Sequence, residues 1–289
     1  MRLKFAFLFL ALAAGSAGAE QINVNGVVRT YILDRATTTK PGPVIIGLHG
    51  GGGSAAAFKQ DTGLSPLANA AGVAVVYPET SSKQWNDGRI VRKRLFHRAP
   101  ADDMGFLQAL VNDLVAKGIA DPNRVIFTGI SNGGMMSFAM ACKSSIPIYA
   151  VVPISANLPV GLDCDRAKTR LINIVGTADR VVPMQGGPVL GGLEQGAVQS
   201  SQETFNEFLK SGGCNGTAKS DLPNVANDGM TSVSVSGVGC KLSPIRQIIV
   251  QGGGHAWAGG AAHLKATTGS PTQDFSASQI VVQLATGKL

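Results

Sequence analysis

The sequence predicts an α/β fold with a mostly parallel central sheet covered by helices on both faces. Continuous apolar runs at 43–48, 73–77, 124–130 and 149–154 predict strands buried on both sides. Segments with helical spacing of apolar residues alternate with these runs, which is typical of βαβ units. Glycines gather where the predicted strands end, so loops are expected at one edge of the sheet.

The remaining elements follow from local signals along the chain. Asn25-Gly26 suits a type I′ turn and predicts a hairpin of strands 22–24 and 28–33. Further strands are expected at 170–175, 231–236 and 246–250. Apolar spacings and capping residues predict helices at 64–71, 102–118, 132–143, 200–210 and 276–287.

The first residues have the pattern of an export signal. Arg2 and Lys4 precede an apolar run at 5–14, and Ala17-Gly18-Ala19 supplies small residues for cleavage. The run is about ten residues long, whereas a bilayer span needs roughly 20, so a retained anchor is the weaker alternative. We therefore expect a signal peptide at 1–19, a single domain at 20–289, and an extracellular or periplasmic protein without a membrane anchor that is a monomer.

The charge of the chain indicates no nucleic-acid partner. The formal net charge is +7, and two of the positive charges lie in the predicted signal. The densest basic cluster is interpreted as a solvated loop, without aromatic interleaving or a known nucleic-acid module, although attraction to anionic surfaces stays open. It consists of Arg89, Arg92, Lys93, Arg94 and Arg98.

Four cysteines follow the predicted signal: Cys142, Cys164, Cys214 and Cys240. An even number in an exported chain predicts two disulfides, for which three connectivities exist. We favour the pairs that are neighbours in sequence, because they close short loops. A zinc site is disfavoured because no C-x-x-C spacing occurs, and no metal is expected.

The strongest chemical signal is the motif Gly129-Ile130-Ser131-Asn132-Gly133 between a predicted strand and a predicted helix. In a G-x-S-x-G turn the serine is strained, and side chains at the flanking glycines would clash. Ser131 is therefore predicted to be a nucleophile of an α/β-hydrolase fold. The alternative is an ordinary Ser/Gly turn in which Asn132 caps the helix.

A serine hydroxyl needs a base, and the fold places an acid and then a histidine after it in the chain. His255 follows a buried strand within a glycine loop and is preferred to His263; His97 is expected to be structural. Asp179 follows the strand at 170–175 and is predicted to hold the imidazole in the tautomer that faces Ser131.

The glycine run after His49 predicts an oxyanion hole. Backbone N–H groups of Gly51 and of Asn132, the residue after the nucleophile, are the expected donors. A phosphate-binding loop would need a following Lys-Ser/Thr, which is missing. Because a serine, a histidine base and an oxyanion hole suffice for ester hydrolysis, no cofactor is expected.

Several of these segments appear together in one order: HGGGGS at 49–54, WNDGR at 85–89, DDMGF at 102–106, GISNGGMM at 129–136, GTAD at 176–179 and GGHAW at 253–257. This set resembles the extracellular polyhydroxybutyrate depolymerase and feruloyl esterase family, related to carbohydrate esterase family 1. The resemblance implies an α/β-hydrolase fold, a triad of Ser131, Asp179 and His255, and disulfides. Ala258 departs from the proline that is frequent after the tryptophan.

Two tryptophans and two aspartates in these segments have competing interpretations. Trp85 and Trp257 are candidates for stacking on the substrate. Asp102 and Asp103 are interpreted as caps and loop anchors rather than catalysts.

The sequence as a whole predicts a secreted serine ester hydrolase with a two-step acyl-enzyme mechanism. Its substrates would be hydroxyalkanoate oligomers or hydroxycinnamoyl esters of plant polysaccharides. An acetyl-xylan or aromatic polyester esterase would use the same residues, and a peptidase stays open. A non-catalytic envelope binding protein is the alternative of a different class, although binding alone needs no such triad.

Overall fold

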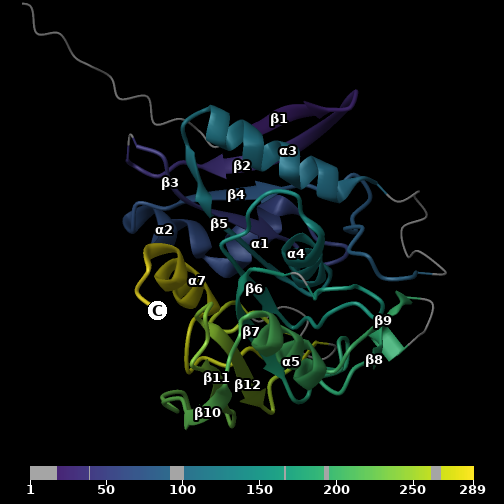
Figure 1. Ribbon diagram of the computed structural model, residues 1–289, viewed down its shortest axis with the longest axis vertical. Coiled ribbons are helices and arrows are strands. Elements are labelled where there is room, and N and C mark those ends of the chain that lie inside the picture. The colour runs from purple at the N-terminus through teal and green to yellow at the C-terminus, as the bar shows by residue number, and fades with distance from the viewer. Residues whose placement is uncertain (1–17, 39, 92–100, 166, 192–194, 262–267) are drawn as a thin grey trace, which may run out of the picture.

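A computed structural model describes residues 18–38, 40–91, 101–165, 167–191, 195–261 and 268–289. Its framework is a ten-stranded sheet in the order β1-β2-β4-β3-β5-β6-β7-β12-β11-β10. Figure 1 shows this sheet running from β1 at the top to β10 at the bottom, with helices on both sides. A separate two-stranded sheet pairs β8 with β9.

Apart from β8, β9 and β10, which were not predicted, the bounds of the strands agree with the predicted strands to within a few residues. They are β1 (Ala19–Val24), β2 (Val27–Asp34), β3 (Gly42–Leu48), β4 (Ala74–Pro78), β5 (Ala120–Ile130), β6 (Ala150–Ile154), β7 (Arg170–Gly176), β8 (Gly187–Pro188), β9 (Ala197–Val198), β10 (Gly216–Asp221), β11 (Thr231–Val238) and β12 (Ile245–Gln251).

The helices of the described residues cover the sheet and include a short 3₁₀ turn at Val189–Gly191. They are α1 (Ala55–Thr62), α2 (Leu64–Ala70), α3 (Asp103–Ala116), α4 (Asn132–Lys143), α5 (Ser201–Ser211) and α7 (Ala277–Thr286).

Six central strands run parallel to one another: β4, β3, β5, β6, β7 and β12. Antiparallel strands flank this block on both sides. The parallel strands are almost fully buried, which explains their continuous apolar runs. The mostly parallel sheet predicted from the sequence is therefore confirmed. Because parallel strands end at the same edge, the loops after them meet there.

The sheet separates two hydrophobic layers. Phe106, Met135 and Phe208 of α3, α4 and α5 pack in one layer. Phe58 of α1 and Val281 of α7 pack in the other, together with residues of α2. Neighbouring strand residues alternate between the layers, as a period of two requires. Helices on both faces of the sheet are thus confirmed.

Local signals predicted the turns and caps well. Asn25 and Gly26 both have positive φ, 52° and 83°, as the predicted turn between β1 and β2 requires. Asp102 caps α3 by accepting a hydrogen bond from the Gly105 N–H at 2.8 Å. Asp103 anchors a loop, because one of its oxygens accepts from the Asn86 N–H at 2.7 Å.

The structure also has elements that the patterns did not predict. Helix α1 follows the glycine loop and is capped by Ser54, but its sequence AAAFKQDT has too few apolar residues for a clear helical period. Strand β10 is polar and exposed along its whole length, so it lacks the alternation that predicts a strand.

The disulfides join Cys142 to Cys164 and Cys214 to Cys240, which confirms the predicted pairs. The first ties the end of α4 to the loop after β6. The second ties the chain after α5 to the connection between β11 and β12. Each closes a loop of 22 or 26 residues, which restricts the unfolded chain.

Most of the predicted signal, residues 1–17, lies outside the described residues, as do His97, His263 and the basic residues Arg92, Lys93, Arg94 and Arg98. Among the helices that the structure describes, none is both long and apolar enough to cross a bilayer.

Candidate active site

The predicted catalytic residues lie at one edge of the sheet. Gly51 follows β3, Ser131 follows β5, Asp179 follows β7 and His255 follows β12. All four strands belong to the parallel block, so their carboxyl ends face the same side. This is the edge at which open α/β sheets place their ligands.

Ser131 occupies the strained turn that its motif predicts. It has φ 57° and ψ −124°, a left-handed conformation that is rare for a residue with a side chain. Its N–H donates to the Ile154 carbonyl at 3.0 Å, which ties the turn to the neighbouring strand β6. The side chain is half-buried and stands before the first turn of α4.

The two glycines of the motif are required by close backbone contacts. A Cβ at Gly129 would lie 2.6 Å from the Leu48 carbonyl oxygen. A Cβ at Gly133 would overlap the same oxygen and lie 2.6 Å from the His49 carbonyl oxygen. The end of β3 therefore passes directly against the nucleophile turn, and only glycine fits at either position.

His255 and Asp179 form a hydrogen-bonded pair. The Nδ1 atom of His255 lies 2.8 Å from Oδ2 of Asp179. The other carboxylate oxygen accepts from the N–H groups of Val181 and Val182, both at 2.8 Å. The exposed fractions of the two side chains are only 9% and 2%. A carboxylate at this position favours the tautomer that carries its proton on Nδ1, in which Nε2 is the proton acceptor.

Ser131 and His255 line the same hollow, whose volume is about 300 Å³. Ile130, Phe58 and Trp257 make its apolar wall. The rings of Phe58 and Trp257 meet edge to face with centroids 5.2 Å apart. The geometry therefore brings the predicted nucleophile and base together around a cavity with an aromatic side.

The predicted oxyanion donors come from adjoining loops at this hollow. A Cβ added at Gly51 would lie 3.8 Å from the Cβ of Asn132. Gly52 and Gly53 donate to carbonyls within the protein, whereas the Gly51 N–H has no partner among the described residues. The N–H of Asn132 is the first of α4 and therefore lacks an intrahelical acceptor.

Buried His49 and the partly exposed Glu79 support the glycine loop. The sequence pattern placed His49 at the start of this loop but did not identify Glu79. His49 Nδ1 lies 2.8 Å from the Gly50 carbonyl oxygen, and its Nε2 lies 3.0 Å from Oε1 of Glu79. Burial alone would raise the pKa of Glu79, but His49 and the N–H groups of Ala55 and Thr80 lower it below the ordinary value. Glu79 follows β4, so its position at a strand end was an available signal.

The structure does not place Trp85 where a substrate could stack on it, which corrects the prediction for this residue. Its side chain is 1% exposed, and its indole N–H donates to the His49 carbonyl at 2.9 Å. Burial among apolar side chains, with the indole N–H paired, makes it a core residue under the glycine loop. Trp257 does line the hollow, while its indole N–H donates to Ser278 at 3.0 Å.

Arg89 also differs from its predicted role in a solvated loop. It is 7% exposed and pairs with Asp87, with 2.8 Å between Nη2 and Oδ2. The nearby carboxylate and the carbonyl of Gln195 offset the cost of burying its charge.

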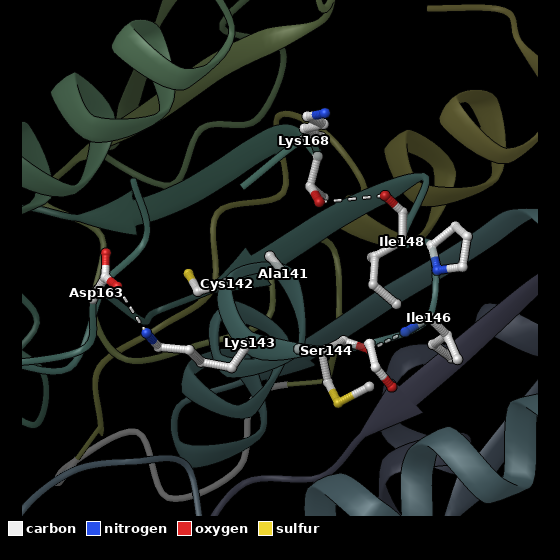
Figure 2. A pocket seen from close by; sticks show the side chains of 12 residues that line it. Ala141, Cys142, Lys143, Ser144, Ile146, Ile148, Asp163 and Lys168 are labelled. Carbon is white, nitrogen blue, oxygen red and sulfur yellow. Dashed lines mark hydrogen bonds and ion pairs between the residues drawn. The ribbon is translucent and has the colours of Figure 1, made fainter. Parts of the chain in front are cut away.

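A larger hollow, about 690 Å³, lies at the opposite end of α4 from Ser131. Figure 2 shows it beside Cys142, with Lys143 paired to Asp163 and Lys168 placed apart from them. None of the predicted catalytic residues lines it. Within the described part of the chain, no group of three or more His, Cys, Asp or Glu side chains could hold a metal ion.

The fold and site together define the chain as an α/β-hydrolase. A family model described as "Esterase PHB depolymerase" matches residues 29–169, which include the glycine loop and Ser131 but end before Asp179 and His255. The solved acetyl xylan esterase from Aspergillus awamori has a TM-score of 0.56 over 82% of this chain and 94% of that structure. At 16% identity this likeness supports the fold alone.

Curated relatives agree with the family model. The putative esterase NocK from Nocardia uniformis subsp. tsuyamanensis is 28% identical over 96% of this chain and 84% of its own length. Feruloyl esterase C from Emericella nidulans is 28% identical over 82% of this chain and 78% of the relative. The chain spans 40% of feruloyl esterase B from Piromyces equi, again with 28% identity. The chain therefore resembles the polyhydroxybutyrate depolymerase and feruloyl esterase family and is a carboxylic-ester hydrolase.

Proposed function

We propose that the chain hydrolyses esters in two steps with Ser131 as the nucleophile. Ser131 Oγ attacks the ester carbonyl carbon, and Nε2 of His255 takes the hydroxyl proton. That proton passes to the alcohol oxygen as its bond to the acyl carbon breaks. Water then attacks the acyl carbon as His255 takes one of its protons. That proton passes to Ser131 Oγ as the bond between Oγ and the acyl carbon breaks, which releases the acid and restores Ser131 and His255.

The proposal rests on the 2.8 Å contact between His255 Nδ1 and Asp179, next to a hollow that Ser131 also lines. In this arrangement Asp179 orients the imidazole and stabilises its protonated form during each step. The N–H groups of Gly51 and Asn132 stabilise the negative oxygen of each tetrahedral intermediate. One such donor typically lowers the barrier by about 3 kcal/mol.

Esters with a compact apolar or aromatic acyl group fit this hollow best. A volume of about 300 Å³ with Phe58 and Trp257 in the wall suits a single ring or a short chain rather than a long segment of polymer. Hydroxycinnamoyl esters are therefore our first substrate class, and hydroxyalkanoate oligomers are the second. Catalytic efficiencies on methyl ferulate, acetylated xylan, hydroxybutyrate oligomers and a neutral peptide would rank these classes directly.

We further propose that residues 1–19 are a cleaved signal and that 20–289 form one exported, monomeric catalytic domain. Strand β1 begins at Ala19, so the cut would fall at the start of the first strand. The two disulfides favour an oxidising compartment. The mass of the protein recovered from periplasm and medium tests this proposal, since an uncut chain would contradict it.

Substitution of the nucleophile is the direct test of the mechanism. Ser131→Ala should lower kcat on p-nitrophenyl butyrate by at least about 10⁴-fold, because the remaining site contributes only binding and oxyanion stabilisation. A fluorophosphonate probe should label the wild-type protein at Ser131 and leave the variant unlabelled. Near-normal activity of the variant would overturn the mechanism, and a wild type that neither reacts nor labels would indicate a binding protein.

A further inference from the structure

The side chain of Asn132, the residue that carries one proposed oxyanion donor, is held from several directions. Its Oδ1 accepts from the Trp85 N–H at 2.7 Å, and its Nδ2 donates to the Trp85 carbonyl at 3.0 Å. The same Nδ2 donates to Oδ2 of Asp87 at 2.6 Å. Such bonds leave this amide no freedom to rotate without breaking two or more contacts.

Asp87 is in turn held by a guanidinium group. Arg89 Nε lies 2.9 Å from Oδ2 of Asp87, and Nη2 lies 2.8 Å from the same oxygen. Both side chains are 3% exposed. Nη1 of Arg89 donates to the Gln195 carbonyl at 2.9 Å, so the pair is fastened to a second loop. A buried ion pair seldom adds net stability, which suggests another reason for its place here.

The pair lies where small displacements matter for the chemistry. Oxyanion donors act through preorganisation, and shifts of a fraction of an ångström reduce their effect. Asn132 carries both the fastened amide side chain and the donor N–H, and it directly follows Ser131, whose φ is 57°. A displacement of the Asn132 side chain therefore also shifts the Asn132 N–H.

We propose that Asp87 and Arg89 are positioning residues for the oxyanion hole, acting through the side chain of Asn132. This inference rests on the proposed two-step mechanism and adds to it two residues that do not touch the substrate. The carboxylate receives the Asn132 amide on one side and the guanidinium on the other. It thereby fixes where the first N–H of α4 stands relative to the nucleophile.

The test compares Asp87→Asn and Arg89→Lys with the wild type. Asp87→Asn should lower kcat about 10- to 100-fold with KM within threefold, because transition-state stabilisation is lost and ground-state binding is kept. Arg89→Lys keeps the positive charge next to Asp87 and should therefore lower kcat less than Asp87→Asn does. The Ki of a trifluoromethyl ketone, whose adduct places an oxyanion in the hole, should rise by the same factor as kcat/KM falls. The pH profile should keep its shape, because His255 is untouched.

Asp103→Asn is the matched control. Asp103 is another buried carboxylate that pairs with an arginine, Arg29 at 2.7 Å, and it holds the same loop through the Asn86 N–H. It makes none of the Asn132 contacts described above, so kcat and the inhibitor Ki should stay within threefold of wild type. All assays are run well below the Tm of each variant, so that unfolding does not contribute.

The outcomes distinguish the positioning role of Asp87 and Arg89 from the two-step mechanism on which it rests. If Ser131→Ala is inactive while Asp87→Asn keeps its kcat and its inhibitor Ki, the positioning role is wrong and the mechanism stands. Equal losses in the Asp87 and Asp103 variants would also overturn it, because they would indicate general loosening of the loop. Activity that survives in Ser131→Ala would overturn both.

Discussion

Helix α4 has a hollow at each of its ends, and the two hollows differ in what converges on them. The one at the C-terminal end is more than twice as large, about 690 Å³ against 300 Å³. Its charged side chains, Lys143, Asp163 and Lys168, are exposed, and Lys143 pairs with Asp163. The hollow at the N-terminal end is smaller, but it receives a strained serine, a histidine held by a buried carboxylate, and backbone N–H groups for which the described part of the chain offers no acceptor.

The smaller hollow is the candidate active site because of the groups that converge on it, not because of its volume. The positive end of the α4 dipole faces Ser131, where an oxyanion would form, and the negative end faces the larger hollow. Burial at the N-terminal end also strengthens each electrostatic interaction, whereas water screens the charges at the other end.

The largest expected effect comes from Asp179. Asp179→Asn should lower kcat by about 10⁴-fold, because an amide that donates toward His255 Nδ1 would favour the wrong tautomer. Steady-state kinetics on p-nitrophenyl butyrate measure this. The amide oxygen can still accept from Val181 and Val182, so the fold should persist, and circular dichroism is the control. A loss below tenfold would contradict the assignment of Asp179 as the orienting acid.

Next in size is the packing of the nucleophile turn. Gly133→Ala should destabilise the protein by about 3 kcal/mol or more, because the added Cβ overlaps backbone oxygens that cannot move aside. Urea denaturation gives the free energy of unfolding. Gly118→Ala is the control: Gly118 has a positive φ of 68°, but its added Cβ would meet nothing within 4 Å. It should cost only about 1 kcal/mol; equal costs would show that contacts with β3 are unimportant.

A smaller effect is expected from Glu79, which supports the glycine loop. Its pKa in the folded protein is lowered from the ordinary 4.5, so its charge stabilises the fold at pH values above 4.5. This contribution is lost as the pH falls through the lowered value. Glu79→Gln should therefore destabilise the protein by about 1 kcal/mol at pH 7 and by less under acid conditions. Unfolding curves at pH 7 and pH 3.5 test the sign, and a penalty that grows toward acid would contradict it.

The smallest effect is predicted at the larger hollow. Lys143→Ala breaks an ion pair whose side chains are 40% and 66% exposed. Such pairs contribute about 0–1 kcal/mol, and no catalytic group lies at this end of α4. Stability should change by less than about 1 kcal/mol and kcat by less than twofold. A tenfold loss of activity would mean that the two ends of the helix are functionally coupled.

The sequence predicted those features whose cause is local. Period and apolar content identified the buried strands, and the spacing of Gly129, Ser131 and Gly133 identified a strained turn before its φ was known. Order along the chain then pointed to Asp179 and His255. The predictions of the strands and of the strained turn are confirmed because a strand buried on both faces, and a serine between two obligatory glycines, leave a pattern within a few residues.

The predictions failed where a residue's environment comes from distant segments. Trp85 and Arg89 lie in one short motif, and their burial depends on contacts with His49, Asn132 and Gln195 that no local period encodes. Helix α1 and strand β10 carry too little apolar pattern to be recognised.

From its residues alone, then, this chain specified an α/β sheet, its nucleophile turn and its cysteine pairs, because these depend on neighbours in the chain. Only the tertiary structure brings together Glu79 and His49 in a polar contact, Asp87 and Asn132 in a hydrogen bond, and the rings of Phe58 and Trp257 edge to face. Such contacts arise only when the ends of parallel strands are brought to one edge, where packing selects partners that lie dozens of residues apart.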